Sequence, residues 1–362
     1  MESKVYFTSM KISHHESLLD RLEKLTKAAG IEQIDFQNKF VAIKIHFGEP
    51  GNLAYLRPNY ARRIVSIVKS LGGKPFLTDC NTLYVGRRKN ALDHLSSAFE
   101  NGYNYFQTDC HTIIADGLRG TDEAEIVINK EFVKSAKIGR AIADADIIIS
   151  MSHVKGHGLA GFGGALKNLG MGSGSRAGKH EMHSSGKPFI REDKCKGCMM
   201  CIKNCAAGAI TMTDKKSKIN PDLCVGCGRC IGVCSFDAIR VDWNESSVNL
   251  NKKIAEYAFA VVLDKPAFHI NFIIDVSPDC DCDATNNVPI IANIGFLASF
   301  DPVALDKASV DLINQAPMIN GYEDSKNNHF TALNPNTTWD AGLKHGEKIG
   351  LGTMNYQLIE VK

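Results

Sequence analysis

Two runs of cysteines constrain this 362-residue chain more than any other feature of its sequence. Both runs have the spacing C-x2-C-x2-C-x3-C, and together they hold eight of the twelve cysteines. The first run is Cys195, Cys198, Cys201 and Cys205, and the second is Cys224, Cys227, Cys230 and Cys234. Such tight clusters indicate metal ligation and not a disulfide framework. Three thiolates at this spacing can surround one [4Fe–4S] cluster, so the sequence predicts two such clusters.

The region that holds both runs, residues 187–243, resembles the bacterial two-cluster ferredoxin module. An Ala-Ile pair follows the fourth cysteine of each run, which marks an internal repeat. In ferredoxins of this kind the fourth cysteine of each run binds the other cluster. The resemblance therefore implies one cluster on Cys195, Cys198, Cys201 and Cys234, and the other on Cys224, Cys227, Cys230 and Cys205. One feature departs from the module: the proline that usually follows the fourth cysteine is Ala206 in the first run and Ser235 in the second.

Zinc binding is the alternative for these cysteines. Zinc sites favour two C-x2-C pairs with a long gap between them, and runs of three cysteines with a fourth at x3 suit tetrahedral zinc poorly. Both the spacing and the repeat therefore favour iron–sulfur clusters. A module of this kind moves one electron at a time, so we expect the rest of the chain to consume or supply electrons.

Strand-like and helix-like segments alternate along the rest of the chain. Apolar or β-branched runs predict strands over 39–47, 74–79, 124–129, 145–152, 267–275 and 289–295. Helical spacing of apolar residues predicts helices over 57–73, 87–102, 131–143, 246–260 and 301–314. Because this alternation is typical of βαβ units, we expect an α/β fold with a mostly parallel sheet flanked by helices.

Two of these helices carry more specific signals. Asp301 is expected to be the N-cap of the helix over 301–314, and Pro302 its first helical residue. The helix over 87–102 has Leu92, Leu95 and Phe99 along one stripe.

The cysteine-rich region interrupts the α/β pattern. We expect residues 1–186 and 244–362 to form the two parts of one α/β domain, and residues 187–243 to be an inserted small α+β two-cluster ferredoxin domain. Three consecutive domains are the alternative. Residues 172–188, just before the insertion, are rich in glycine and serine and show no periodicity, so we expect a linker or a functional loop there.

A second unusual stretch is SHVKGHGLAGFGGALKNLG, residues 152–170, which follows an apolar run. Residues 156–161 match G-x-G-x-x-G, but no strand with an acidic end lies about twenty residues further on, so a dinucleotide fold is not favoured. We expect instead that the glycines let backbone N–H groups cradle an anion, helped by the N-terminus of a following helix. The cofactor-binding candidates are Gly156, Gly158, Gly161, Gly163 and Gly164.

The same stretch supplies the candidate catalytic residues His153, Lys155, His157 and Lys167. We expect the two lysines and the loop amides to hold a carboxylate or phosphate, and His153 or His157 to move a proton. A flexible connection whose histidines are merely solvated is the alternative.

A third candidate site lies in the sequence DCDCD, residues 279–283, which follows an expected strand. Cys280 and Cys282 are separated by one residue and should lie at the same edge of the sheet as the glycine loop. With His180 and His183 they are candidates for a further metal ion, because imidazole and thiolate ligands suit zinc or iron. His180 and His183 lie in the expected loop, which would then act as a lid. The alternative is a pair of reduced, half-buried cysteines and surface histidines.

Several longer segments resemble the family catalogued as domain of unknown function 362, in the form that carries an inserted ferredoxin module. They are SHVKGHGLAGFGGALKNLGMG, SRAGKHEMHS, DCNTLYVGRRKNALDHLSSAFENGY, and CDC followed by ASFDPVALDKASVDLI. The resemblance spans nearly the whole chain and implies an α/β protein with redox cargo, but no particular reaction. Cys80 stands where that form of the family has threonine or aspartate, and we assign it no role.

Composition excludes some classes of partner. The net charge is +2, so nothing suggests a general attraction to nucleic acid or anionic lipid. No run approaches eighteen apolar residues, and the first residues lack the pattern of a signal peptide. We therefore expect no membrane span, no nucleic-acid partner and a cytoplasmic location.

The leading functional hypothesis is an oxidoreductase. Two [4Fe–4S] clusters would pass electrons between a partner protein and a substrate or metal held at the glycine-rich loop, and an anionic small molecule is the candidate substrate. One alternative is a non-catalytic electron carrier or assembly subunit that docks a partner enzyme. Another is a racemase-like or transferase-like enzyme with structural clusters. A flavin at the glycine loop also stays open.

Overall fold

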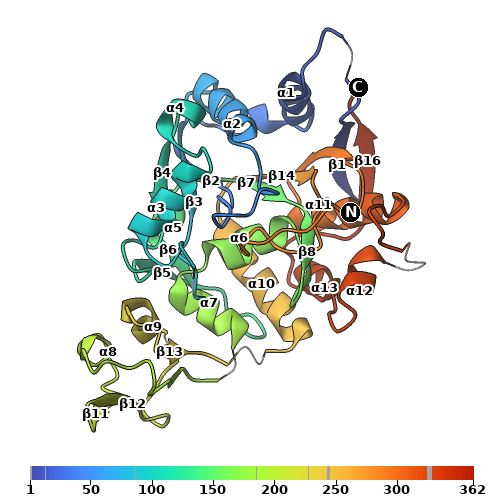
Figure 1. The fold of residues 1–362 in the computed structure, drawn as a ribbon. Helices are drawn as coiled ribbons and strands as arrows, with labels where there is room; N and C mark the ends of the chain where they lie inside the picture. The colour runs from blue at the N-terminus through green and yellow to red at the C-terminus, as the bar shows by residue number, and fades with distance from the viewer. Residues whose placement is uncertain are drawn as a thin grey trace.

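The computed structural model describes residues 2–12, 14–84, 86–184, 186–226, 228–242, 245–323 and 328–362. Its main feature is an eight-stranded sheet made of β1 (Ser3–Ser9), β2 (Phe40–Lys44), β3 (Lys74–Asp79), β4 (His111–Ile114), β7 (Ile147–His153), β14 (Ala267–Ile273), β15 (Gly295–Ser299) and β16 (Tyr356–Glu360). The strand order is β16-β1-β15-β14-β7-β2-β3-β4 (Figure 1). Only the two pairings of β15 are antiparallel, so the mostly parallel sheet expected from the sequence is confirmed.

Residues of the central strands alternate between two hydrophobic cores. Val41 and Ile43 of β2 belong to the core on one face, whereas Ala42 belongs to the core on the other face, and β7 follows the same alternation. Strands buried on both faces appear in the sequence as continuous apolar runs, which is why these strands were recognisable from the sequence.

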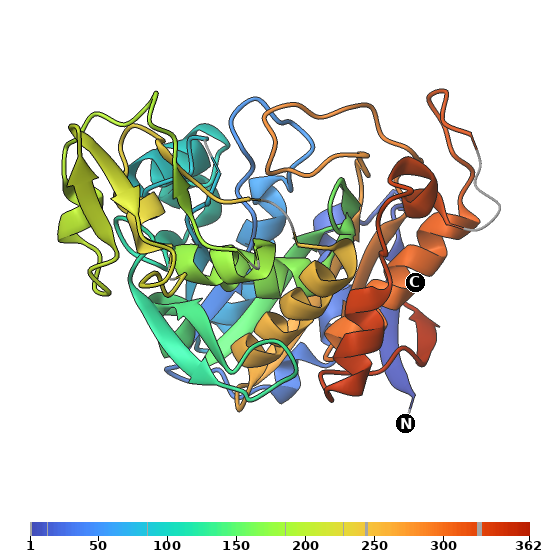
Figure 2. The ribbon, with the colours of Figure 1, turned by 90° about the horizontal axis from the view of Figure 1, so that it is seen from below.

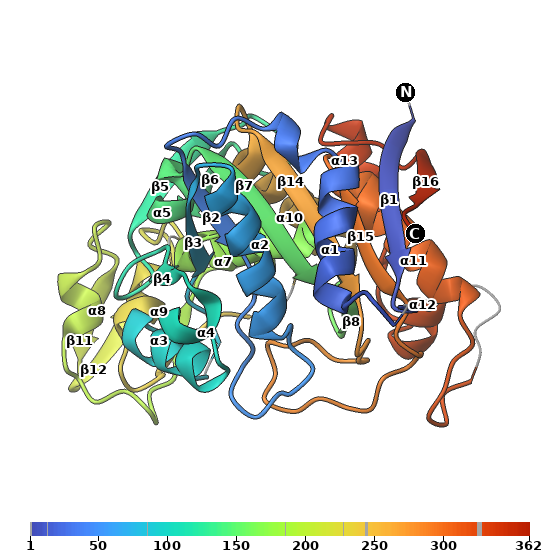
Figure 3. The same ribbon diagram turned by 90° about the horizontal axis from the view of Figure 1, so that it is seen from above.

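Two layers of helices cover the sheet (Figure 3). Helices α1 (Leu18–Ala28) and α2 (Pro58–Ser70) lie on one face. The second layer, in front of the sheet in Figure 2, consists of α6 (Ala165–Ser173), α10 (Ser247–Val262), α11 (Pro302–Gln315) and α13 (Ala341–Lys348). Among the residues described, no helix is long and apolar enough to cross a membrane.

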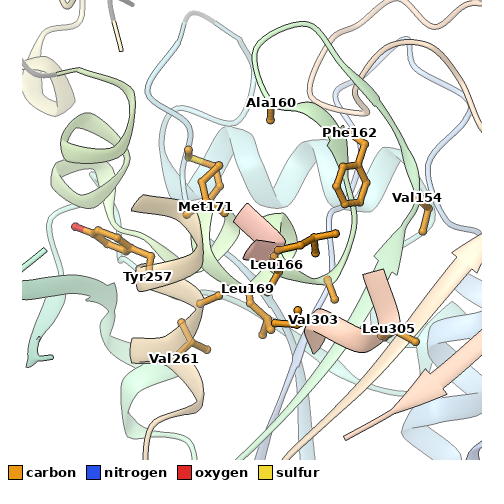
Figure 4. Packing of buried hydrophobic residues seen from close by; sticks show 14 of the residues in the cluster. Val154, Ala160, Phe162, Leu166, Leu169, Met171, Tyr257, Val261, Val303 and Leu305 are labelled. Atoms are coloured by element: carbon orange, nitrogen blue, oxygen red, sulfur yellow. The ribbon is translucent and has the colours of Figure 1, made fainter. Parts of the chain in front are cut away.

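Helix α6 is packed tightly into this second layer (Figure 4). Leu166 and Leu169 lie in one apolar cluster with Tyr257 and Val261 of α10 and with residues of α11. A Cβ atom on Gly170 would lie 2.1 Å from the carbonyl oxygen of Ile254, so glycine is required where α6 and α10 approach each other. This packing fixes the position of the polar residues that α6 carries.

Two expected elements differ in the structure. The helix expected over 131–143 is mostly a strand: β5 (Glu123–Val127) pairs with β6 (Ser135–Gly139), and only α5 (Arg140–Asp144) is helical. Ala136 and Ile138 are both buried, which is the two-residue period of a strand. The strand expected over 289–295 begins instead at Gly295, and the preceding residues form only an isolated bridge between Ile291 and Met318.

The two specific helix predictions, for the start of the helix over 301–314 and for the apolar stripe of the helix over 87–102, had different outcomes. Helix α11 begins as predicted, because the Asp301 carboxylate accepts from the N–H groups of Val303 and Ala304 and Pro302 is the first helical residue. Helix α3 (Ala91–Glu100) exists, but its apolar stripe faces solvent, with Leu92 66% exposed. The buried side of α3 carries His94, which lies 3.7 Å from the Asp79 carboxylate.

The stretch expected to be a linker or loop is instead helical and mostly buried. It ends α6 and forms α7 (Arg176–His183), whose N-cap Ser175 accepts from the N–H of Gly178. A Cβ on Gly178 would lie 2.6 Å from the carbonyl oxygen of Lys137, so small residues allow this polar helix to pack closely. The lid interpretation of this segment is therefore wrong.

The cysteine-rich region forms a small α+β unit that protrudes from the larger domain (Figure 1). Its elements are β10 (Phe189–Ile190), α8 (Met200–Lys203), β11 (Ile210–Thr213), β12 (Lys216–Ile219), α9 (Arg229–Val233) and β13 (Ile239–Arg240). Strand β10 pairs with β13, and β11 with β12. A small core that includes Cys201, Cys230 and Ile231 is completed by Leu83 of the larger domain. The division at residues 187 and 243, and the ferredoxin identity of the unit, stay predictions.

Candidate functional site

A cavity of about 270 Å³ opens at the carboxyl ends of the parallel strands. Lys44 ends β2, Asp79 ends β3 and His153 ends β7, and all three line the cavity. Cys280 and Cys282 line it from the loop that follows β14. Ligands of parallel α/β sheets bind beyond this edge of the sheet, so the position is that of a binding site.

Lys44 and Asp79 form a buried ion pair in the cavity wall that sequence reasoning missed. Lys44 Nζ lies 2.9 Å from Asp79 Oδ1 and donates to Asn168 Oδ1 at 2.8 Å. Asn168 in turn donates to the carbonyl oxygens of Lys44 and Met151, which ties α6 to two strand ends. Burial works to raise the pKa of Asp79, but Lys44 and other nearby cations hold it below its ordinary value. The signal that could have found both residues is their place at the end of a strand.

His153 and Lys155 hold the loop of residues 279–283 in place. His153 Nδ1 lies 2.8 Å from Asp281 Oδ1, and Lys155 Nζ lies 3.3 Å from Asp281 Oδ2. His153 Nε2 lies 2.8 Å from the carbonyl oxygen of Ile274. Both ring nitrogens therefore face acceptors, and neither remains to move a proton on a substrate. His153 is a positioning residue, which differs from the role expected from the sequence.

His157 lies beside the thiol pair. One donor atom from each of His157, Cys280 and Cys282 lies within 4.8 Å of the others, a spacing that a metal ion could bridge. Nδ1 of His157 accepts from the N–H groups of Leu159 and Ala160 at 3.2 and 3.0 Å. Burial and the nearby Lys167 lower the pKa of His157 well below its ordinary value, so the ring is neutral and carries its proton on Nε2.

The two thiols are not equivalent. The backbone N–H of Cys282 donates to the sulfur of Cys280 at 3.4 Å, and Lys167 Nζ lies 3.4 Å from the same sulfur. The neighbouring Cys282 thiol and the lysines lower the pKa of Cys280, whereas the neighbouring Cys280 and burial raise the pKa of Cys282. Cys280 is therefore the thiol of the pair that ionises more readily. Burial raises the pKa of the neighbouring Cys80, which donates to the carbonyl oxygen of Ser173 and stays a thiol.

The glycine loop is a tight hairpin of β8 (Lys155–His157) and β9 (Gly161–Gly163). A Cβ on Gly156 would lie 2.1 Å from the carbonyl oxygen of Pro278, and one on Gly161 would lie 2.8 Å from Trp339. A Cβ on Gly163 would lie 3.1 Å from Lys167, whereas Gly158 has open space around it. At Gly156 and Gly161, therefore, glycine allows close packing of the chain against itself, whereas the anion cradle expected from the sequence stays a prediction.

The N-terminus of α6 is occupied by the protein itself. The N–H groups of Ala165 and Leu166 donate to the Asp306 carboxylate at 2.6 and 2.9 Å, and a Cβ on Gly164 would lie 2.2 Å from Asp306 Oδ1. Burial raises the pKa of Asp306 to about 6. The helix end therefore cannot hold a ligand anion, which corrects the expectation from the sequence.

Lysine side chains of the cavity could hold an anion. Lys155, Lys167 and Lys179 all line the cavity. Lys179 Nζ donates to the carbonyl oxygen of Gly174 at 2.6 Å. Within the described ranges, neither Lys167 nor Lys179 forms an ion pair with a carboxylate, so the cavity has an excess of positive charge. Charged and apolar side chains together line this cavity, which could hold a metal ion or a cofactor.

The cysteines of the two runs line two small hollows in the protruding unit. One hollow is lined by Cys195, Cys198, Cys201 and Cys234, and the other by Cys205, Cys224 and Cys230. Cys227 lies outside the described residues. The fourth cysteines have equivalent surroundings, since Cys205 accepts from the N–H of Ala209 and Cys234 from the N–H of Ala238. Each hollow thus combines cysteines of both runs.

Comparison with known proteins identifies the family. The family described as Domain of unknown function (DUF362) matches residues 41–311, which is more than half of the chain. The chain belongs to this DUF362 family. No curated protein matches it.

A search of solved structures finds two proteins with a distant similarity to the DUF362 chain. The lactate racemase apoprotein from Thermoanaerobacterium thermosaccharolyticum is 13% identical, with a TM-score of 0.42, over 86% of this chain and 58% of the other. A protein from Thermotoga maritima is 11% identical, with a TM-score of 0.39, over 82% of this chain and 58% of the other. The DUF362 chain thus spans less than two thirds of each of these proteins.

Helix α7 of the DUF362 protein joins the cavity to the protruding unit. Lys179 and His183 line the cavity. His180 lies on the side of α7 that faces the protruding unit, where a Cβ on Gly228 would come within 3.2 Å of the His180 Cβ. Burial lowers the pKa of His180 to about 4. The structure therefore brings His157 to the thiol pair, and His183 to the cavity, but places His180 against the second cysteine run.

Proposed function

We propose that this DUF362 protein is an iron–sulfur redox enzyme. Residues 187–243 hold two [4Fe–4S] clusters, and the cavity binds an anionic small molecule that is oxidised or reduced there. The observation that carries the proposal is the mixed lining of the two hollows, since Cys234 lies with the first run and Cys205 with the second. That exchange is the ligand arrangement of two-cluster ferredoxins.

The surroundings of these cysteines fit iron–sulfur clusters. Apolar residues share the hollows with the cysteines, including Ile190 and Ile239 in one and Ile210 and Ile219 in the other. Backbone N–H groups point at three of the sulfurs, with Ser217 donating to Cys195 at 3.4 Å in addition to the two bonds to the fourth cysteines. Hydrogen bonds to the ligand sulfurs and low solvent exposure are the means by which proteins set cluster potentials. When bound, such clusters give and take single electrons.

A buried cation next to the cysteines adds support. Arg176 of α7 is 1% exposed, and its charge interacts with the Asp116 carboxylate and, more weakly, with Cys230 and Cys234. Nη1 donates to the carbonyl oxygen of Lys89, whereas Nε and Nη2 have no hydrogen-bond partner among the described residues. A buried guanidinium with two unpartnered nitrogens is costly, and a cluster with four thiolates, carrying a charge of about −2 when oxidised, would add to the compensation that Asp116 gives.

The residues of the cavity have distinct tasks in this proposal. Lys155, Lys167 and Lys179 attract and orient an anionic substrate. His157, with its proton on Nε2, can donate to a group that gains negative charge. Helix α7 carries Lys179, which lines the cavity, and His180, which lies against the second cysteine run, so electrons would pass between the two sites across this one short helix.

The test begins with protein purified without oxygen. We expect about eight irons and eight sulfides per chain, and an electron paramagnetic resonance signal after reduction by dithionite. Cys198→Ser should lower the iron content by about half. Cys110→Ser is the matched control, because this buried thiol contacts the carbonyl oxygen of Pro75 and lies outside both hollows. Zinc without sulfide in the purified protein would refute the proposal.

A second test uses Arg176→Gln. This variant should keep its iron, but the reduction potential of at least one cluster should become more negative, because a nearby positive charge favours the electron-rich state. A potentiometric titration followed by electron paramagnetic resonance measures the shift. An unchanged potential in a folded variant would show that Arg176 does not face a cluster.

A further inference from the structure

We propose that Cys280 and Cys282 are a redox-active dithiol that cycles with a disulfide, and that its oxidant is the disulfide of an anionic small thiol. The inference rests on the proposed function, because the proposed clusters would supply the two electrons that reduce the pair again. It adds the identity of the reacting groups in the cavity and the chemical class of the substrate.

The geometry supports a reactive pair. Both cysteines line the cavity, and their sulfurs lie within 4.8 Å of each other. Lys167 Nζ lies 3.4 Å from Cys280, and a thiolate beside a lysine is the reactive form of cysteine. The loop is held rigidly, because Asp281 between the two cysteines is bound by His153 and Lys155, and its carbonyl oxygen accepts from the N–H of Glu49.

The surroundings favour a dithiol over a metal ion. A histidine that binds a metal usually donates its second ring nitrogen to a carbonyl or carboxylate. His157 does the opposite, since its Nδ1 accepts from two backbone N–H groups and its proton is left on Nε2. Lys155 and Lys167 also line the same cavity, and their charges oppose the binding of a divalent cation there.

The exchange reaction balances in two steps. The Cys280 thiolate attacks one sulfur of the substrate disulfide, so that a mixed disulfide forms and the first substrate thiolate leaves. Cys282 then attacks the Cys280 sulfur, which forms the Cys280–Cys282 bond and releases the second substrate thiolate. The proton of Cys282 goes to one of the released thiolates. Two electrons from a one-electron donor and one proton then return the pair to one thiolate and one thiol.

The charge of the cavity selects the substrate class. Lys167 and Lys179 line it without a carboxylate partner among the described residues, and Lys155 lies beside them. Leaving thiolates are also anionic, so the same lysines stabilise the products. A disulfide that carries carboxylate or phosphate groups fits this lining, whereas a cationic disulfide does not.

The first experiment detects the disulfide directly. Oxygen-free protein is treated with glutathione disulfide and alkylated, and the peptide with Cys280 and Cys282 is analysed by mass spectrometry. After oxidation we expect this peptide to carry no alkyl label and to be lighter by two hydrogens than the unlabelled, reduced peptide. Treatment with dithionite-reduced methyl viologen before alkylation should restore both labels. Two cysteines that stay alkylated after oxidation would overturn the inference. So would a metal ion beyond the eight irons that is lost in Cys282→Ser.

The second experiment tests the substrate class with two disulfides of opposite charge. Glutathione disulfide should oxidise the pair about tenfold faster than cystamine, because the cavity attracts anions. Lys167→Met should remove most of this preference, and Lys167→Arg should retain it. Lys134→Met, at an exposed lysine outside the cavity, is the matched control and should change nothing. An equal or faster rate with cystamine would overturn the assignment of an anionic substrate.

Iron and sulfide are measured on the same samples, which separates the two proposals. Eight irons with cysteines that never pair would refute only the dithiol. A reversible disulfide in protein without iron or sulfide would refute the proposed iron–sulfur function and leave the dithiol with another reductant.

Discussion

The protruding cysteine-rich unit and the α/β domain build their sites in opposite ways. The unit takes its candidate ligands from one stretch of forty residues, Cys195 to Cys234, and its own hydrophobic core is small. The cavity of the α/β domain collects side chains from Lys44 to Cys282 at the edge of a sheet supported by two large cores. We therefore expect the unit to depend on its proposed clusters for its structure, whereas the cavity depends on the packing beneath it.

The largest expected effect comes from removing iron and sulfide. Without them the unit should lose its hydrogen-exchange protection between β10 and β13, whereas β2, β7 and β14 should keep theirs. The reason is that a core this small cannot offset the entropy of ordering the unit, and bound clusters supply the missing free energy. Hydrogen exchange followed by mass spectrometry on loaded and apo protein measures the difference. Unchanged hydrogen-exchange protection of the unit in apo protein would contradict the expectation that the unit depends on its clusters.

The next largest effect should come from the core of the α/β domain. Phe272 is fully buried between Tyr60 and Phe296, with ring centroids 5.2 Å from each. Phe272→Ala should lower the free energy of unfolding by about 3–5 kcal/mol without changing the iron content. Phe106→Ala is the matched control, because Phe106 is 88% exposed, and its effect should stay within about 0.5 kcal/mol. Urea denaturation gives both values, and parallel loss of iron would contradict the independence of the two regions.

Acid should affect the two regions differently. Burial lowers the pKa of His269 in β14 from 6.5 to about 3, whereas residues 187–242 contain no histidine. As the pH falls below 6.5, the unfolded chain binds a proton at this residue that the folded chain does not, so stability is lost. Between pH 7 and pH 5 the loss from His269 is about 2 kcal/mol. Urea midpoints at both pH values should show a smaller loss in His269→Gln than in the unaltered protein; equal losses would contradict the assignment.

The smallest effect is expected on the exposed stripe of α3. Leu92→Asp should change the free energy of unfolding by no more than about 0.5 kcal/mol, because Leu92 faces solvent. Ala98→Asp on the buried side of the same helix should be strongly destabilising, because it would bury a carboxylate. Thermal unfolding of the two variants measures the contrast. A large effect of Leu92→Asp would mean that the stripe packs against something.

Much of the fold followed from local patterns. Strands β2, β3, β7 and β14 were expected from their apolar runs, and the start of α11 from Asp301 and Pro302, because alternation and capping act over a few residues. The helix expected over 131–143 was wrong because Ala136 and Ile138 have the spacing of a strand, which short apolar segments share with helices. The segment before the cysteines was misjudged because α7 is stabilised by packing of small residues and not by an apolar stripe.

The candidate site was predictable only in part. His153, Lys155, His157, Lys167, Cys280 and Cys282 do come together, as expected for residues that follow parallel strands. Their roles could not be predicted from the sequence, because they depend on partners more than a hundred residues away. His153 forms a hydrogen bond with Asp281, and the N-terminus of α6 donates to Asp306. Lys44, Asp79 and Lys179 were missed, although Lys44 and Asp79 stand at the ends of β2 and β3.

By itself the sequence determined the eight cysteines with their repeat, the parallel α/β architecture and the chemical groups at the strand ends, because each of these depends on spacing within a short segment. Only the tertiary structure decided which histidine meets the thiol pair, which glycines serve packing, and which lysines remain without a carboxylate partner among the described residues. Such choices depend on contacts between distant segments, where burial and charge pairing in three dimensions set the role of each side chain.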